Sequence, residues 1–323
     1  MTESRIIRPY PGFIIPPRRF VDVGMPRSGV TMSGRYQIRV LDAYGIEKRR
    51  TPWFDNIILD SGLNRWGTAT IISGAAIGTG TSTPASTDTG LQTQTTYTTT
   101  AGTGAGISAG IATNYNNTRT FVYRTTLGAL NGNYTEVGVG WASGSNMFSR
   151  ALILDGGGTP TTLSVSSSEQ LDIAYQLSVY PPIVDTGPTT ITISGVDYDV
   201  TGRAASVTNT GRWSVSNSVW QADSGGVGTV YTGTLGAITA TPGGSANSAG
   251  DGQSYTNNAY SASSNQATSY ISYPLNSGNI SGGIKTSIIT WGSAWFQYEF
   301  DPVIPKDNTK TLVLNYSVNW ARR

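Results

Sequence analysis

The segment QLDIAYQLSVY, Gln170–Tyr180, decides the fold. Its apolar side chains recur at every second position, with polar or small side chains between them. This period is typical of a β-strand with one face in the core and one in water, as in an antiparallel sheet. The expected core face is Leu171, Ile173, Tyr175, Leu177 and Val179. The expected solvent face is Gln170, Asp172, Ala174, Gln176 and Ser178.

The final strand-like segment, Lys310–Trp320, repeats this alternation. Its apolar positions are Leu312, Leu314, Tyr316, Val318 and Trp320. Three more blocks recur in the same order, pairing residues 122–130 with 230–238, 137–141 with 287–291, and 148–155 with 296–301. These matches predict a diverged duplication, with residues 240–283 inserted in the second copy. The duplication is too short for a solenoid or propeller.

The domain boundary is expected at a proline-rich turn. Pro181-Pro182 closes the first alternating segment, and Asp185–Pro188 follows as a linker. We therefore expect an all-β protein of two antiparallel β-sandwich-like domains, residues 34–183 and 184–323.

The composition favours strands and loops over helices. Only 12% of residues are charged, and glycine, serine, threonine and asparagine take their place. Threonine is β-branched, and serine and asparagine compete for backbone hydrogen bonds, so long runs of them disfavour helix. The hydrophobic fraction of 37% still permits a substantial core. One short helix is expected within Asp60–Gly67, with Asp60 or Ser61 as its N-cap.

Residues 1–33 are expected to form an extended N-terminal arm. Their prolines, including the adjacent Pro16-Pro17, forbid regular helix and favour an extended chain. Several side chains are too apolar for a free tail, so we expect the arm to lie along another surface. The candidate interface residues are Arg5, Arg8, Phe13, Ile14, Ile15, Arg18, Arg19 and Phe20.

The basic charge is concentrated near the start of the chain. Residues 1–50 carry ten lysines and arginines against four acidic residues, while the whole chain has a net charge of +2. A basic segment can bind nucleic acid. Here the basic residues are scattered among prolines and apolar positions, so docking on an acidic protein neighbour is the preferred interpretation and nucleic acid is an unlikely partner.

The sequence predicts a non-enzymatic protein. It contains neither histidine nor cysteine, which removes the commonest general base and the thiolate nucleophile. The glycine-rich segments 78–82 and 155–158 are not followed by the Lys-Ser/Thr pair that binds phosphate in nucleotide-binding loops, so they are interpreted as turns. A pair of carboxylates serving a polysaccharide depolymerase is the alternative. Its candidates are Asp55, Asp60, Glu136 and Glu299.

No cofactor, metal site or membrane span is expected. The patterned calcium-binding loop is missing, and no apolar run is long enough to cross a bilayer. Aromatic residues could stack on sugars, but most fall at alternating strand positions, which favours core or interface packing. Less patterned, and candidates for an interface, are Trp213, Trp220, Trp291 and Trp295.

Four segments resemble virion proteins of tailed bacteriophages. They are WFDNIILDSGLNRWG (53–67), residues 76–91, the run 136–155, and residues 169–175. The resemblance is clearest over residues 35–182 and extends more faintly to the C-terminus. Proteins of this group are described as tail-fibre, baseplate or other tail-associated structural parts, and the group offers no catalytic motif to transfer.

The resemblance implies a homo-oligomeric structural part of a phage tail, which contacts itself and other virion proteins. Such a protein would be located in the virion, after assembly in the host cytoplasm. Two alternatives remain open: a receptor-binding module that recognises host surface glycan through loops such as 240–283, or a capsid-decorating protein.

Overall fold

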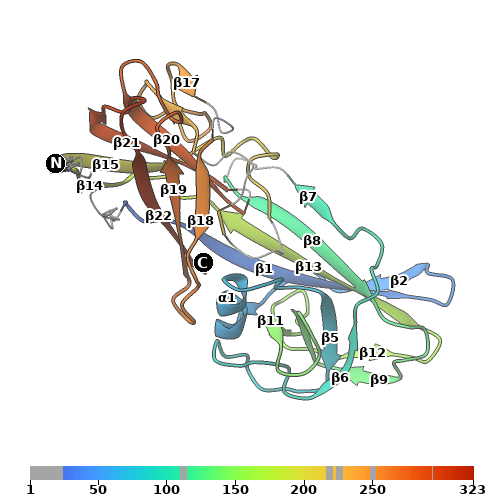
Figure 1. Ribbon diagram of the computed structural model, residues 1–323. Helices are drawn as coiled ribbons and strands as arrows, with labels where there is room; N and C mark the ends of the chain where they lie inside the picture. The colour runs from blue at the N-terminus through green and yellow to red at the C-terminus, as the bar shows by residue number, and fades with distance from the viewer. Residues whose placement is uncertain (1–24, 110–114, 216–220, 223–227, 248–251, 293) are drawn as a thin grey trace, which may run out of the picture.

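The structure is a computed structural model that describes residues 25–109, 115–215, 221–222, 228–247, 252–292 and 294–323. Strands dominate it, and α1 (Asp60–Trp66) is the only helix in these ranges. The expected all-β, sandwich-like fold is confirmed (Figure 1). The short helix also lies where it was expected, but its N-cap is Leu59, which offers no capping side chain.

A nine-stranded sheet connects the two halves of the chain, in the order β18-β19-β22-β1-β13-β8-β7, with β2 and β3 also paired to β1. Its strands are β1 (Ser28–Leu41), β2 (Glu47–Arg50), β3 (Phe54–Asp55), β7 (Ile107–Ala109), β8 (Asn117–Arg124), β13 (Gln170–Tyr180), β18 (Ser254–Asn257), β19 (Gln266–Tyr273) and β22 (Leu312–Arg322). In Figure 1 the long strands β1, β13 and β8 run diagonally between the two ends of the molecule.

Each half adds a sheet of its own. The first half forms the order β4-β11-β10-β5-β6, and the second forms β14-β15-β21-β20-β16-β17. The first sheet comprises β4 (Ile57–Ile58), β5 (Gly74–Gly78), β6 (Gln94–Thr98), β10 (Glu136–Gly140) and β11 (Met147–Leu152), beside a small ladder of β9 (Gly132–Tyr134) and β12 (Leu163–Val165). The second comprises β14 (Thr186–Ile193), β15 (Val196–Ala204), β16 (Val230–Tyr231), β17 (Ala246–Asn247), β20 (Ile284–Trp291) and β21 (Ala294–Ile304).

The two halves share one strand order. Eight strands of the first half make the same pairings as eight strands of the second half. Taken in chain order, the first set is β4, β5, β6, β7, β8, β10, β11 and β13, and the corresponding set is β15, β16, β17, β18, β19, β20, β21 and β22. Three of the four matched sequence blocks fall on strands that correspond in this way. The block 122–130 does not: it lies on β8, whose counterpart is β19, whereas 230–238 begins on β16.

Residues 240–283, expected as an insertion, hold β17, β18 and β19. These strands occupy the places of β6, β7 and β8, so this segment belongs to the repeated pattern. The block 122–130 was matched with 230–238 because the two share a short apolar pattern. The place of a strand in a sheet depends instead on the strands that pair with it.

The shared strand β1 is hydrogen-bonded on both sides. It pairs antiparallel with β13 from Thr31 to Leu41, and parallel with β22 from Ser28 to Met32. The sheet therefore continues across the division expected at residue 184. Residues 28–33, expected in the arm, form the first part of β1, because Val30 and Met32 are buried beneath this double pairing.

The core faces of the two alternating segments are confirmed, since every apolar position named for β13 and β22 is buried. The expected solvent face of β13 is wrong at Asp172, Ala174 and Ser178, which are also buried. Side chains from neighbouring strands account for the burial of Asp172. A guanidinium nitrogen of Arg39 on β1 lies 2.8 Å from its carboxylate, and one of Arg124 on β8 lies 2.7 Å from it.

Candidate functional site

The candidate arm residues, from Arg5 to Phe20, lie outside the described residues. Met25, the first described residue, is buried. Pro26 lies beside Gly187 at the start of β14. The Tyr298 hydroxyl donates to the Ser28 hydroxyl at 2.9 Å, so the chain enters β1 against the sheet of the second half.

Glu136, one of the candidate carboxylates, is fully buried at the start of β10. Its oxygens accept the backbone N–H groups of Gly80, Gln92 and Thr93 at 2.7–2.9 Å. Arg150 on β11 donates to it at 3.0 Å and also pairs with Asp88 at 2.8 Å. A carboxylate engaged in this way fixes the loop between β5 and β6.

Glu299 makes related contacts in the second half, from a strand that does not correspond to β10. It lies on β21, accepts the N–H of Leu235 at 2.8 Å and pairs with Lys285 at 3.3 Å. Glu136 and Glu299 thus belong to different sheets, and the structure does not bring them together as a pair. Of the other two candidates, Asp60 pairs with Arg322, and Asp55 is exposed at the end of β3.

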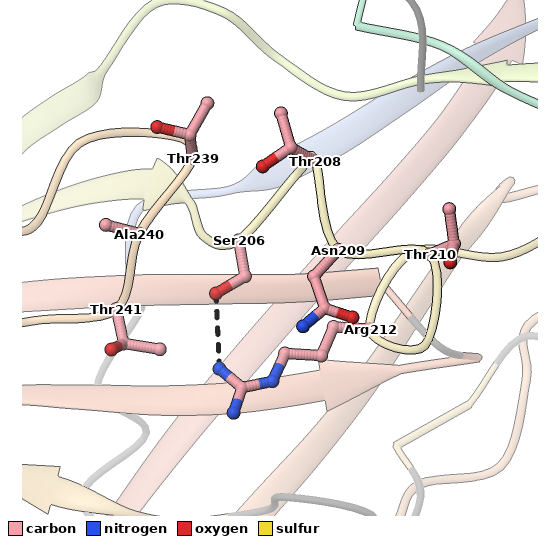
Figure 2. Close-up of a pocket in the computed structure, with 8 residues that line it drawn as sticks. All are labelled: Ser206, Thr208, Asn209, Thr210, Arg212, Thr239, Ala240 and Thr241. Atoms are coloured by element: carbon pink, nitrogen blue, oxygen red, sulfur yellow. Dashed lines mark hydrogen bonds between the residues drawn. The ribbon is translucent and has the colours of Figure 1, made fainter. Parts of the chain in front are cut away.

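A hollow of about 610 Å³ opens between two turns of the second half (Figure 2). One turn follows β15 and the other connects β16 with β17. The hollow is lined by Ser206, Thr208, Asn209, Thr210, Arg212, Thr239, Ala240 and Thr241. Almost all of these side chains carry a hydroxyl, an amide or a guanidinium group, which makes the hollow strongly hydrophilic.

Backbone hydrogen bonds hold the two turns together. Ser206 N–H donates to the Ala240 carbonyl at 3.0 Å, and Val207 N–H donates to the Ile238 carbonyl at 2.9 Å. Ser206 has a positive φ of 55°, which is uncommon for a residue with a side chain. The Asn209 side chain accepts the N–H of Gly211 at 3.0 Å, which closes the turn that presents Arg212.

Arg212 lies at the centre of this arrangement. Its guanidinium group stacks 4.2 Å from the ring centre of Trp295 and donates to the Ser206 hydroxyl at 3.3 Å. Among the described residues, no carboxylate pairs with it. Burial raises the pKa of Tyr231 nearby, and the positive charge of Arg212 partly opposes this shift. In Figure 2 the side chains of Ser206, Asn209 and Arg212 converge on one side of the hollow.

No pattern in the sequence singles out Arg212. The available signal was the Asn209–Arg212 turn followed by a tryptophan, which by itself indicates only a loop. Trp295, one of the four unpatterned tryptophans, is half-buried beneath Arg212. Trp213 and Trp291 are core residues, and Trp220 lies outside the described residues.

Two further hollows are smaller and differently lined. One, of about 550 Å³, lies between Gly67-Thr68 and the segment 257–268. The other, of about 440 Å³, is walled by the 82–94 loop and by Arg150, which already pairs with two carboxylates.

In the described part of the chain, no three histidine, cysteine, aspartate or glutamate side chains gather as metal ligands would. No helix there has the length and apolar character needed to cross a membrane. Comparison with known proteins gives no family: no family model, curated protein or solved structure matches the chain.

Proposed function

We propose that the chain is a non-enzymatic structural component of a tailed-bacteriophage virion, located in the tail, and that it acts by oligomeric assembly. The resemblance of residues 53–67, 76–91 and 136–175 to tail-associated proteins supports this proposal. In this function the N-terminal arm docks on a neighbouring subunit or another virion protein, and the two sandwiches provide rigid walls.

The observation that carries the proposal is the position of β1. This strand continues directly from the arm and is hydrogen-bonded on both sides, to β13 and to β22. Because these two strands belong to different halves, a force applied to the arm would enter the middle of the large sheet and be shared by both halves. A connection of this kind suits a part that transmits load between subunits.

The edges of the sheets support oligomeric assembly. Strand β14 is paired only with β15 among the described residues, and Thr186–Ile193 contains no charged side chain. Natural edge strands use charges, prolines or bulges to discourage pairing with another chain, and in β14 the proline, Pro188, and the register shift both fall within residues 186–189. An uncharged edge fits the addition of a strand from a neighbour, which supplies backbone hydrogen bonds across the contact.

Deletion of residues 2–24 tests the proposal, because it removes most of the arm and leaves β1 intact. The truncated chain is expected to retain the circular dichroism and thermal melting of the full chain but to be missing from purified particles when it replaces the wild-type protein. Incorporation at the wild-type level would overturn the proposal.

Two sets of substitutions distinguish the kinds of contact made by the arm. Combined Phe13→Ser, Ile14→Ser and Ile15→Ser changes are expected to abolish incorporation, because these apolar side chains anchor the arm. Combined Arg18→Ser and Arg19→Ser changes are expected to weaken it in a salt-dependent manner. If the arginine changes abolished incorporation and the apolar changes did not, the contact made by the arm would be electrostatic, as expected for nucleic acid.

A further inference from the structure

The Arg212 hollow differs from the corresponding place in the first half. There, the segment after β4 is helix α1, and its Arg65 stacks 5.2 Å from the ring centre of Trp141. Both arginines therefore follow corresponding strands, and both lie on a tryptophan near the hairpin of their own sheet. Arg65 donates to the carbonyl of Thr70 and lines none of the three hollows described above.

In the second half, an open turn replaces the helix, and the arginine lines a hollow. Among the described residues, the Arg212 side chain makes one hydrogen bond, a long one to the Ser206 hydroxyl. A guanidinium group has five N–H donors in a fixed fork, so the described residues leave most of its donor capacity unused. The ring of Trp295 packs against the guanidinium group.

The charge of Arg212 and the fork of its donors select an anion. Guanidinium groups bind carboxylates through two parallel hydrogen bonds, with geometry as well as charge in their favour. No described carboxylate neutralises this arginine, whereas Arg150, the buried arginine of the first half, pairs with two.

The remaining lining selects a ligand with many hydroxyl groups. Ser206, Thr208, Thr210, Thr239 and Thr241 carry hydroxyls that both donate and accept, and Asn209 adds an amide with both capacities. A volume of about 610 Å³ falls within the usual range for small-ligand sites. A small inorganic anion would leave most of this polar wall unused.

From these contacts we infer that the hollow binds a carboxylate-bearing saccharide, with the carboxylate on Arg212 and the sugar hydroxyls on the threonine-lined turns. This site does not depend on the arm or on the structural function proposed above, so either one can fail while the other stands. The alternative of a neutral glycan is disfavoured because it would leave the guanidinium group without an anion.

Calorimetric titration of the full chain with trigalacturonic acid tests the inference. Saturable binding at millimolar or lower concentration is expected, and Arg212→Gln is expected to weaken it about tenfold or more through loss of a charge-assisted bidentate contact. The matched control is Arg65→Gln, the counterpart in the first half, which is expected to bind like the wild type. The methyl ester of the same trisaccharide, which keeps the rings but loses the charge, is expected to bind about tenfold more weakly or worse.

Thr208→Val provides an independent variant if Arg212→Gln fails to fold, because it removes one hydroxyl at an exposed position and is expected to reduce affinity. Three results would overturn the inference: no saturable binding of trigalacturonic acid, equal affinity for the acid and its methyl ester, or equal affinity for sodium sulfate. The last result would define an anion site without saccharide recognition.

Discussion

The two halves of the molecule fix corresponding loops with different chemistry. In the first half, a fully buried glutamate, Glu136, accepts three backbone N–H groups from the β5–β6 loop and is neutralised by the buried Arg150. In the second half, the neutral Gln297 is fully buried and accepts the N–H of Gly236, while Glu299 is partly exposed and pairs with Lys285. One strand order thus accommodates a buried charge in one half and a buried amide in the other.

Because of this chemistry, the two halves should differ in how much stability they lose when a loop contact is removed. A buried ion pair contributes little net stability, yet removal of one partner leaves an uncompensated charge in a low-dielectric interior. A partly exposed pair is screened by water and loses little when broken. We therefore expect substitutions on corresponding core strands to cost equal unfolding free energy in the two halves. Substitutions at the loop contacts should cost unequal amounts.

The largest expected effect concerns the core strands β13 and β22. Tyr175 and Tyr316 are both fully buried at comparable places, so Tyr175→Asp and Tyr316→Asp should each cost at least about 4 kcal/mol of unfolding free energy. Urea unfolding or soluble yield measures the loss. Asn319→Asp, on the exposed face of β22, is the control and should change stability by only tenths of a kcal/mol. Tolerance of either tyrosine change would break the equivalence of the two strands.

A smaller and unequal effect is expected at the two loop-fixing pairs. Arg150→Met should cost about 3–5 kcal/mol because it leaves Glu136 buried without its charge partner. Lys285→Met should cost less than about 1 kcal/mol, since Glu299 can be hydrated. Urea denaturation of both variants at neutral pH makes the comparison. Equal losses would show that the second pair is as desolvated as the first.

The smallest expected effect is a difference in pH dependence between the residues that precede β13 and β22. Hydrogen bonds from Arg49 and from the Ser166 N–H hold the pKa of Glu169 well below its ordinary value of 4.5. Asp307, whose pKa is lowered by the Thr309 hydroxyl and by Lys310, is more exposed: 51% of its side chain, against 4% for Glu169.

A carboxylate with a depressed folded-state pKa stabilises the protein above its unfolded pKa, and this contribution is lost as the pH falls toward the folded value. Glu169→Gln should therefore destabilise the protein at neutral pH, and its deficit relative to the wild type should shrink toward about pH 3. Asp307→Asn should alter the slope much less, because water screens its interactions. Unfolding curves across this pH range distinguish the two, and an identical slope change in both variants would contradict the assignment.

Sequence periodicity predicted the fold class and the core faces of both long strands, because strand patterning is local. It could not predict that Asp172 is covered, since the covering side chains, Arg39 and Arg124, come from strands far away in the sequence. For the same reason, the pattern around Val122 was matched with the wrong strand: pairing partners decide the place of a strand, and its own residues do not reveal them.

The Arg212 hollow was beyond sequence reasoning on similar grounds. It requires two turns about thirty residues apart, joined by the hydrogen bonds of Ser206 and Val207, and a tryptophan from a third segment. None of these segments carries a motif by itself. The arm was the opposite case, since its prolines and apolar residues stand out in the sequence but lie outside the described residues.

The double pairing of β1 has a consequence for the order in which the protein can be completed. Ser28 leaves the ribosome long before its partner Val318, because the two lie about 290 residues apart in the chain. Until then, one edge of β1 stays open, and unpaired strand edges expose a nascent chain to association. The large sheet is complete only when β22 has been made, so a chain that stops short of Leu312 leaves β1 and β19 without this partner.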